Sequence, residues 1–302
     1  MIEYTDYQKV FPPGAQMPYD RKRIHEIEAR RKELGGQLFI DRVLKALGIS
    51  KSKVYPPKND NGVKQLHQQI CESNMSMHHK LSLIYYVLLD FDTVEGQASL
   101  SETFASASSM PQKYEIFMKG LWYMDGLEFS TALEYVAHPS LVSDFADDII
   151  IALVQNAPDG DYDLALSYFH TVQPVLKTSK ALELIFGAMA QTNVTEALLY
   201  SRTYPEHARE QLFRQLIAET LGNKASEQAG ELAFLPFDPT EEAWFEEYLS
   251  TGDGRNLKKA KDTLLVRKIA SDRFDEIRTQ RTSSQWGPVL EGIKSGIEGQ
   301  LE

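Results

Sequence analysis

The chain has 302 residues and a mass of 34.2 kDa, and its 42% apolar, 10% aromatic and 25% charged residues are typical of a globular protein. A chain of this length buries about 75% of its unfolded surface, and its single cysteine, Cys71, excludes an internal disulfide framework. The formal charge of −11 repels polyphosphate, which disfavours a dedicated nucleic-acid clamp.

The single cysteine is typical of a reducing compartment, the cytosol or the nucleus. Residues Met1 to Asp6 show neither the basic nor the apolar part of a secretory signal. The longest apolar run, Ile149 to Val154, is far shorter than the ~20 residues that cross a bilayer. We therefore expect no membrane span.

Residues 1–19 are rich in aromatic residues and proline and show no helical period. This pattern predicts an extended N-terminal arm. Because an extended aromatic segment can lie in a groove of a neighbouring protein, Tyr4, Tyr7 and Phe11 are the candidate partner-binding residues.

Residues 20–110 are predicted to form an N-terminal helical region with linkers. Asp20 is expected to cap a helix that runs to Gly48 and is kinked at Gly35–Gly36. A linker follows over residues 51–62, which are rich in Pro, Asn and Gly. Apolar periodicity then predicts helices over 63–73 and 77–89, and looser structure over 90–109.

Residues 111–302 are predicted to be helix after helix, with short turns at Gly and Pro and no alternating strand pattern. An internal repeat supports this, because residues 127–135, 160–168 and 192–200 align and share the pairs Ala132-Leu133, Ala165-Leu166 and Ala197-Leu198. Hairpins of this length bury their apolar faces by stacking. The prediction is an all-α fold, an α-solenoid of stacked helical hairpins. The alternative is unrelated helices that share an Ala-Leu pair.

Three acidic or metal-like patterns favour structural roles. Asp159 to Asp163 resembles the start of a calcium loop, but Leu164 and His170 stand where that loop requires Gly and Glu. His67, Cys71, His78 and His79 make an incomplete zinc ligand set. Acidic residues near helix ends are expected to cap helices, and they are Asp90, Asp92, Asp144, Asp147 and Asp148.

The common phosphate-binding, zinc-protease and serine-hydrolase motifs are absent from the sequence. We therefore predict no enzyme, no catalytic or metal-binding residue, no cofactor and no small-molecule substrate. Basic residues concentrate over 20–34 and 255–281, where acidic residues dilute them. Solvated surface is the favoured interpretation, and an import signal or a contact with an anionic partner is the alternative.

Several segments then occur in a characteristic order. They are Lys119 to Asp125, which contains Trp122-x-x-Asp125, then Ala132 to Leu141, which contains His138-Pro139, then Leu164 to Leu166, Val172 to Pro174, Thr195 to Leu198, and Leu235 to Glu241, which contains Leu235-Pro236-Phe237. Over roughly residues 111–280 the chain resembles the helical domain of the ELYS nucleoporin family.

The resemblance implies a structural nucleoporin of the nuclear envelope, a scaffold component associated with the Y-shaped outer-ring complex that acts in pore assembly by docking to other scaffold nucleoporins. Animal members are longer, with a β-propeller and a chromatin-binding tail. This chain resembles the short fungal type and lacks an Arg-Gly-Arg-Pro core, so direct DNA or chromatin binding is not expected.

Two other classes remain open. A cytoplasmic helical-repeat adaptor or vesicle-coat scaffold would share the predicted fold, because solenoids serve many functions. An all-α enzyme built around Asp and His residues would be indicated by a stoichiometric bound metal.

Overall fold

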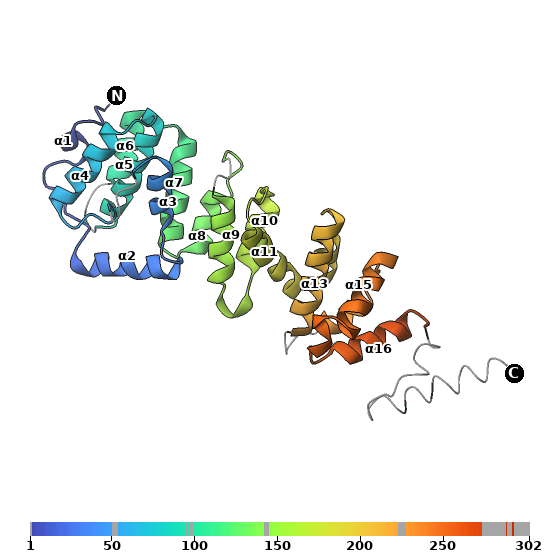
Figure 1. Ribbon diagram of the computed structural model, residues 1–302. Helices are drawn as coiled ribbons and strands as arrows, with labels where there is room; N and C mark the ends of the chain where they lie inside the picture. Colours follow the sequence, from blue (N-terminus) through green and yellow to red (C-terminus); the bar gives the residue numbers. More distant parts are fainter. Residues whose placement is uncertain are drawn as a thin grey trace. The chain divides into compact units, whose positions relative to one another are not determined.

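The computed structural model describes residues 2–49, 54–94, 96, 99–141, 145–222, 228–273, 288 and 292 (Figure 1). Within these ranges every regular element is a helix, which confirms the predicted all-α class. The chain divides into two compact units, Met1–Ile185 and Phe186–Glu302. The boundary between them falls inside a helix, α11 (Ser179–Thr192).

Unit 1 is the N-terminal compact unit. Its helices are α1 (Tyr7–Val10), α2 (Arg21–Glu33), α3 (Phe39–Ala46), α4 (Asp60–Glu72), α5 (Met77–Phe91), α6 (Leu100–Ser108), α7 (Gln112–Asp125), α8 (Phe129–Val136), α9 (Ala146–Gln155), the 3-10 turn η1 (Pro158–Gly160) and α10 (Asp163–Val172).

Helix α5 forms the centre of unit 1. Every residue from Leu81 to Phe91 is buried, and α4, α6 and α7 pack around this helix. A helix that is apolar on all sides needs neighbours on all sides. Helix α7 packs against both α3 and α5 within this unit.

The N-terminal segment differs from the expected extended arm. It contains the short helix α1, which Asp6 caps by accepting the amide of Gln8. Val10, Phe11 and Tyr19 are at most 6% exposed. Their apolar area is covered by the body of the unit, and this burial opposes the entropy cost of ordering the segment. A sequence without helical period can therefore still be core.

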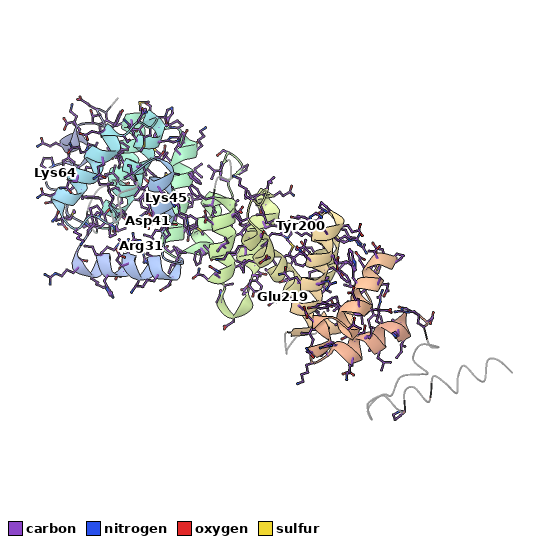
Figure 2. The ribbon with its side chains drawn as sticks, viewed as in Figure 1. Arg31, Asp41, Lys45, Lys64, Tyr200 and Glu219 are labelled. Carbon is purple, nitrogen blue, oxygen red and sulfur yellow. The ribbon has the colours of Figure 1, made fainter. Side chains whose placement is uncertain are left out.

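The predicted helix of residues 20–48 is two helices, α2 and α3. Asp20 caps α2 as predicted, accepting the amide of Arg23 at 2.6 Å. Gly35 and Gly36 take φ of +73° and +91°, so they end α2 instead of kinking it. Arg31 then joins the two helices through paired hydrogen bonds to Asp41, at 2.8 and 3.2 Å (Figure 2). A further helix, α6, lies in the stretch predicted to be looser.

Each of the three aligned repeat segments contains the start of a helix. They correspond to α8, α10 and, in the second unit, α12 (Val194–Ser201). The shared alanines, Ala132, Ala165 and Ala197, are at most 1% exposed. Since Ala lets another helix approach closely, its repeated burial supports the predicted repeat.

Unit 2 is the C-terminal compact unit. It begins with the second half of α11 and with α12. Its further elements are α13 (Glu206–Gly222), α14 (Gln228–Leu232), α15 (Pro239–Ser250), the 3-10 turn η2 (Asp253–Asn256) and α16 (Ala260–Ala270). Helix α13 packs against α12, α14 and α15, and α15 packs against α16. Phe213 and Phe245, both 0% exposed, lie in this core.

Candidate functional site

The Trp-x-x-Asp segment of α7 leads to two buried carboxylates in unit 1. Asp90, near the end of α5, is 1% exposed. It accepts hydrogen bonds from the Tyr19 hydroxyl at 2.6 Å, the Tyr55 hydroxyl at 2.7 Å and the Trp122 indole Nε1 at 2.9 Å. One carboxylate thus ties the N-terminal segment, the segment before α4 and helix α7 to α5.

Asp125, the last residue of α7, makes the second set of bonds. Its Oδ1 accepts the amide of Phe39 at 2.6 Å, and its Oδ2 accepts the amide of Ile40 at 3.0 Å and the Tyr86 hydroxyl at 2.7 Å. These two amides belong to the first turn of α3, which has no partner for them within the helix. Asp125 therefore caps α3 from 85 residues away in sequence.

Burial shifts the pKa of both carboxyl groups. It raises the pKa of Asp90, and it raises the pKa of Asp125 to about 7, although the bonded donors act in the opposite direction. All four oxygens already accept bonds from the chain. The pair therefore holds helices together and is not arranged as an acid and base around a substrate.

The Leu-Pro-Phe segment of unit 2 is held by ion pairs. Glu241 in α15 is 0% exposed, and it accepts the Nε and Nη2 of Arg202 at 2.9 and 2.7 Å and a further bond from Arg209. Burial acts to raise the pKa of Glu241, but the bonds from Arg202, the Asp238 amide and Arg209 outweigh it and lower this pKa. Sequence reasoning missed these arginines, because nothing local marks their partners.

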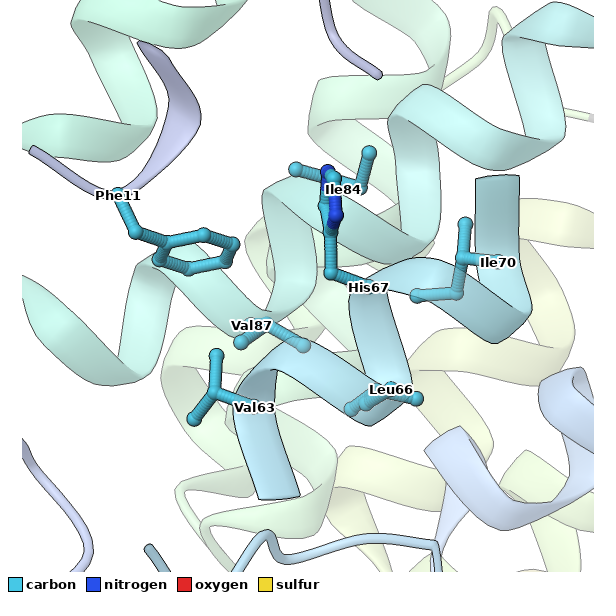
Figure 3. Close-up of a pocket in the computed structure, with 7 residues that line it drawn as sticks. All are labelled: Phe11, Val63, Leu66, His67, Ile70, Ile84 and Val87. Atoms are coloured by element: carbon cyan, nitrogen blue, oxygen red, sulfur yellow. The ribbon is translucent and has the colours of Figure 1, made fainter. Parts of the chain in front are cut away.

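The three predicted partner-binding residues lie together beside α4. The Phe11 ring is 5.0 Å from the Tyr7 ring, and it packs into the apolar layer shown in Figure 3, with no room left for a water molecule. The carbonyl of Tyr4 accepts the Nε2–H of His67 at 2.8 Å. Phe11 is 6% exposed, whereas Tyr4 and Tyr7 keep part of their surface. Lys64 lies over the Tyr7 ring at 5.5 Å.

The zinc-like residues are divided between two places. His67 Nε2 lies 3.6 Å from the Cys71 sulfur, whereas His78 and His79 pack against the Tyr114 ring. Burial raises the pKa of the Cys71 thiol, which favours its protonated, unreactive form. Among the residues that the structure describes, no three His, Cys, Asp or Glu side chains gather in a way that could hold a metal ion.

Most of the remaining acidic candidates act at helix starts. Asp92 accepts the amide of Leu100 at the start of α6 at 2.6 Å, and Asp161 accepts the amide of Asp163 at the start of α10 at 3.1 Å. Asp147 accepts the amide of Thr178 just before α11 at 2.7 Å. Asp161 acts after a turn as the sequence predicts, whereas Asp92 and Asp147 bond to the starts of helices other than the ones they adjoin. Asp144 lies outside the described residues.

The two basic stretches are mixed with acids. In α2, Lys22 lies 3.8 Å from Glu26, and Arg31 lies 2.7 Å from Glu28. In the second stretch, Arg255 and Lys258 are exposed, and residues 274–281 lie outside the described part. In the parts of the chain that the structure describes, none of the helices combines the length and the apolar character that crossing a membrane requires.

The family model for ELYS, described as nuclear pore complex assembly, matches residues 37–252. The chain is also 30% identical over 169 residues to "Uncharacterized protein ely5" of Schizosaccharomyces pombe. That alignment covers 55% of this chain and 53% of the relative, so the chain spans about half the length of the curated relative it matches.

The match begins at residue 37, not at residue 111 as the motifs alone indicate. The structure supplies the reason, because the signature residue Asp125 caps α3, which starts at Phe39. The family region therefore includes the core of unit 1. ELYS is a structural family of nucleoporins, and its location is the nuclear pore complex of the nuclear envelope. The chain belongs to the ELYS family of nuclear pore complex assembly proteins.

Proposed function

We propose that this protein is a scaffold component of the nuclear pore that docks to subunits of the Y-shaped outer-ring complex during pore assembly, and that it has no catalytic activity. Family membership supports the pore assignment. Docking to outer-ring subunits goes beyond what family membership supports and is part of the proposal.

One observation carries the docking role. The polar groups of the signature residues Trp122, Asp125 and Glu241 form hydrogen bonds within the chain, and each bond joins segments that are far apart in sequence. Such bonds fix the relative positions of helices within each unit. Rigid surfaces bind with a smaller ordering cost than flexible ones. Buried charged groups that hold helices in fixed positions are consistent with a scaffold protein.

The proposal includes the N-terminal segment as a partner contact. Tyr4 and Tyr7 keep part of their surface exposed. The segment that carries them is held in place by α4, because His67 donates a hydrogen bond to the Tyr4 carbonyl. Phe11 acts in the interior and supports them. We also include the stacking of the hairpins from residue 111 onward as a solenoid, which the buried repeat alanines support.

Affinity recovery of the tagged full-length chain from its native cells tests the function. We expect outer-ring nucleoporins among the recovered proteins, and a nuclear-rim signal by microscopy. Recovery of coat proteins together with a punctate cytoplasmic signal would instead indicate the coat-scaffold class. A stoichiometric metal ion in the purified chain would favour the all-α enzyme class instead.

Side-chain variants test the N-terminal contact. A Tyr4→Ala/Tyr7→Ala double variant removes partly exposed rings and keeps the Tyr4 carbonyl that His67 binds. We expect weaker recovery of partners with only a small drop in melting temperature, which the lost contact between Tyr7 and Phe11 explains. Full recovery would remove these residues from the interface.

A further inference from the structure

Phe234 is a large apolar side chain that the fold leaves in solvent. It is 67% exposed, whereas its neighbours Ala233 and Leu235 are 1% and 5% exposed. Leaving a Phe in water forgoes about 1.5–3 kcal/mol of burial energy. Phe234 lies between α14 and α15, on the short segment that leads into the Leu-Pro-Phe motif.

The backbone around Phe234 is fixed on both sides by arginines. Arg267 Nη1 donates to the carbonyl of Ala233 at 3.0 Å and to that of Leu235 at 2.5 Å. Arg202 Nη2 donates to the carbonyl of Pro236 at 2.7 Å. The amide of Phe234 donates to a carbonyl in the last turn of α14 at 2.9 Å. The exposed ring therefore has a rigid base.

Both arginines are themselves held in place. Arg267 is 6% exposed, donates its Nε to Glu242 at 2.9 Å and lies 4.3 Å above the Phe237 ring. Arg202 makes its paired bonds to the fully buried Glu241. Binding through such a segment loses little conformational entropy, which is a property of residues that dominate interfaces.

The charge next to Phe234 is negative. Glu231 lies in the preceding turn, is exposed, and has no ion-pair partner in the described part of the chain. The nearby cations Arg202 and Arg267 are neutralised by Glu241 and Glu242. An anionic edge beside an aromatic ring is complementary to an apolar pocket with a basic edge.

The same unit has a second exposed large apolar side chain. Leu199 is 56% exposed and precedes Arg202 by three positions at the end of α12, so the two share a helix face. Arg202 in turn contacts the carbonyl of Pro236. The most exposed large apolar residue of unit 1, Val175, differs, because it lies on an irregular segment with no arginine bonded to its flanking carbonyls among the described residues.

We propose that Phe234 is an anchor residue that inserts into an apolar pocket on a partner protein, and that a Lys or Arg at the edge of this pocket contacts Glu231. The inference rests on the proposed docking function and identifies one surface for it. The partner is a protein whose pocket combines aliphatic walls with a basic edge. A second occupant, the chain's own residues 274–302, is distinguished below.

Quantitative recovery of outer-ring nucleoporins with the tagged full-length chain provides the test. Phe234→Ser should reduce recovery by about tenfold or more, and Glu231→Lys should reduce it several-fold. Val175→Ser is the matched control, more exposed but not held by arginines, and should leave recovery within about twofold. All three variants change exposed side chains, so their melting temperatures should equal that of the unchanged chain.

The outcomes separate the inference from the function on which it rests. If the unchanged chain recovers outer-ring subunits and Phe234→Ser recovers them equally well, the anchor assignment is wrong and the docking function stands. If the unchanged chain recovers none, both are wrong. A photoreactive residue at position 234 that crosslinks to residues 274–302 of the same chain would also overturn the assignment. A crosslink to an apolar pocket of an outer-ring subunit supports it.

Discussion

At Gly120, in the middle of α7, helix propensity and packing against another helix predict opposite effects of a substitution by Ala. Replacing a helical Gly with Ala normally stabilises a helix by about 0.8–1 kcal/mol. In this structure a Cβ at Gly120 would lie 2.7 Å from Val136 Cγ1, 3.0 Å from Tyr135 Cβ and 3.2 Å from the Val136 backbone nitrogen. These atoms belong to α8, which packs tightly against α7. Gly120→Ala should therefore destabilise unit 1.

The size of the effect follows from two opposing terms. Overpacking a close contact costs about 1–3 kcal/mol, and the upper half of this range applies because one clashing atom is backbone and cannot rotate away. Subtracting the helical gain of about 1 kcal/mol leaves a net loss of about 1–2 kcal/mol. Gly187→Ala, in α11, is the matched control. Its Cβ would meet only the ends of Gln215 and Glu219, at 3.4 Å or more, so it should stabilise by about 0.5–1 kcal/mol.

Denaturant unfolding followed by fluorescence measures both variants. The chain has three tryptophans, and a background that retains only Trp122 reports on unit 1, where Gly120 lies, while one that retains only Trp244 reports on Gly187. Combining Gly120→Ala with Val136→Ala removes the nearest clashing atom. The double variant should be more stable than the sum of the single effects predicts, by about 0.5 kcal/mol or more. A stabilised Gly120→Ala, similar to Gly187→Ala, would refute the packing argument.

Three further predictions concern buried groups. Burial raises the pKa of Asp125 to about 7, above its unfolded value of about 4, so its stabilising effect is complete below about pH 4 and is lost as the pH rises through about 7. In urea unfolding between pH 5 and 8, the free energy of unfolding should fall more for the unchanged chain than for Asp125→Asn. An equal fall of this free energy with pH in both chains would contradict the prediction. Glu241→Ala removes the buried carboxylate that Arg202 and Arg209 share and should cost about 3 kcal/mol of stability. The control is Glu247→Ala on the same helix, where an exposed carboxylate lies 3.6 Å from Arg214, and it should change stability by at most about 0.5 kcal/mol. Similar denaturation midpoints for the two variants would count against the ion-pair role of Glu241. Phe11→Ala should cost about 3–5 kcal/mol and lower the melting temperature much more than Tyr4→Ala does, an order that a free N-terminal arm would not produce.

The helical class could be predicted because it depends on local patterns. Apolar residues at helical spacing predict α4 and α5 within a few residues of where they occur. The aligned Ala-Leu pairs place Ala132, Ala165 and Ala197 on buried helix faces. Family signatures are also read from the order of segments along the chain, and the family match bears that identification out.

The N-terminal segment shows where local reasoning stops. Residues 2–19 have no helical period, and an extended arm is the natural interpretation of such a sequence. Phe11 and Tyr19 are nevertheless core residues, since Phe11 packs on Phe91 and Tyr19 bonds to Asp90. Their partners are more than 70 residues away, and no local pattern encodes a partner at that distance.

For this protein the sequence by itself determined the helical class, the cap of α2 at Asp20 and the family, because hydrogen bonds within helices and local capping bonds join residues a few positions apart. Only the tertiary structure decided what the signature residues do. Asp125 stands at the end of one helix, yet it caps another, α3, and Phe234 is apolar, yet it is 67% exposed. Burial and long-range pairing are set by how whole helices pack, so side-chain chemistry alone does not reveal them.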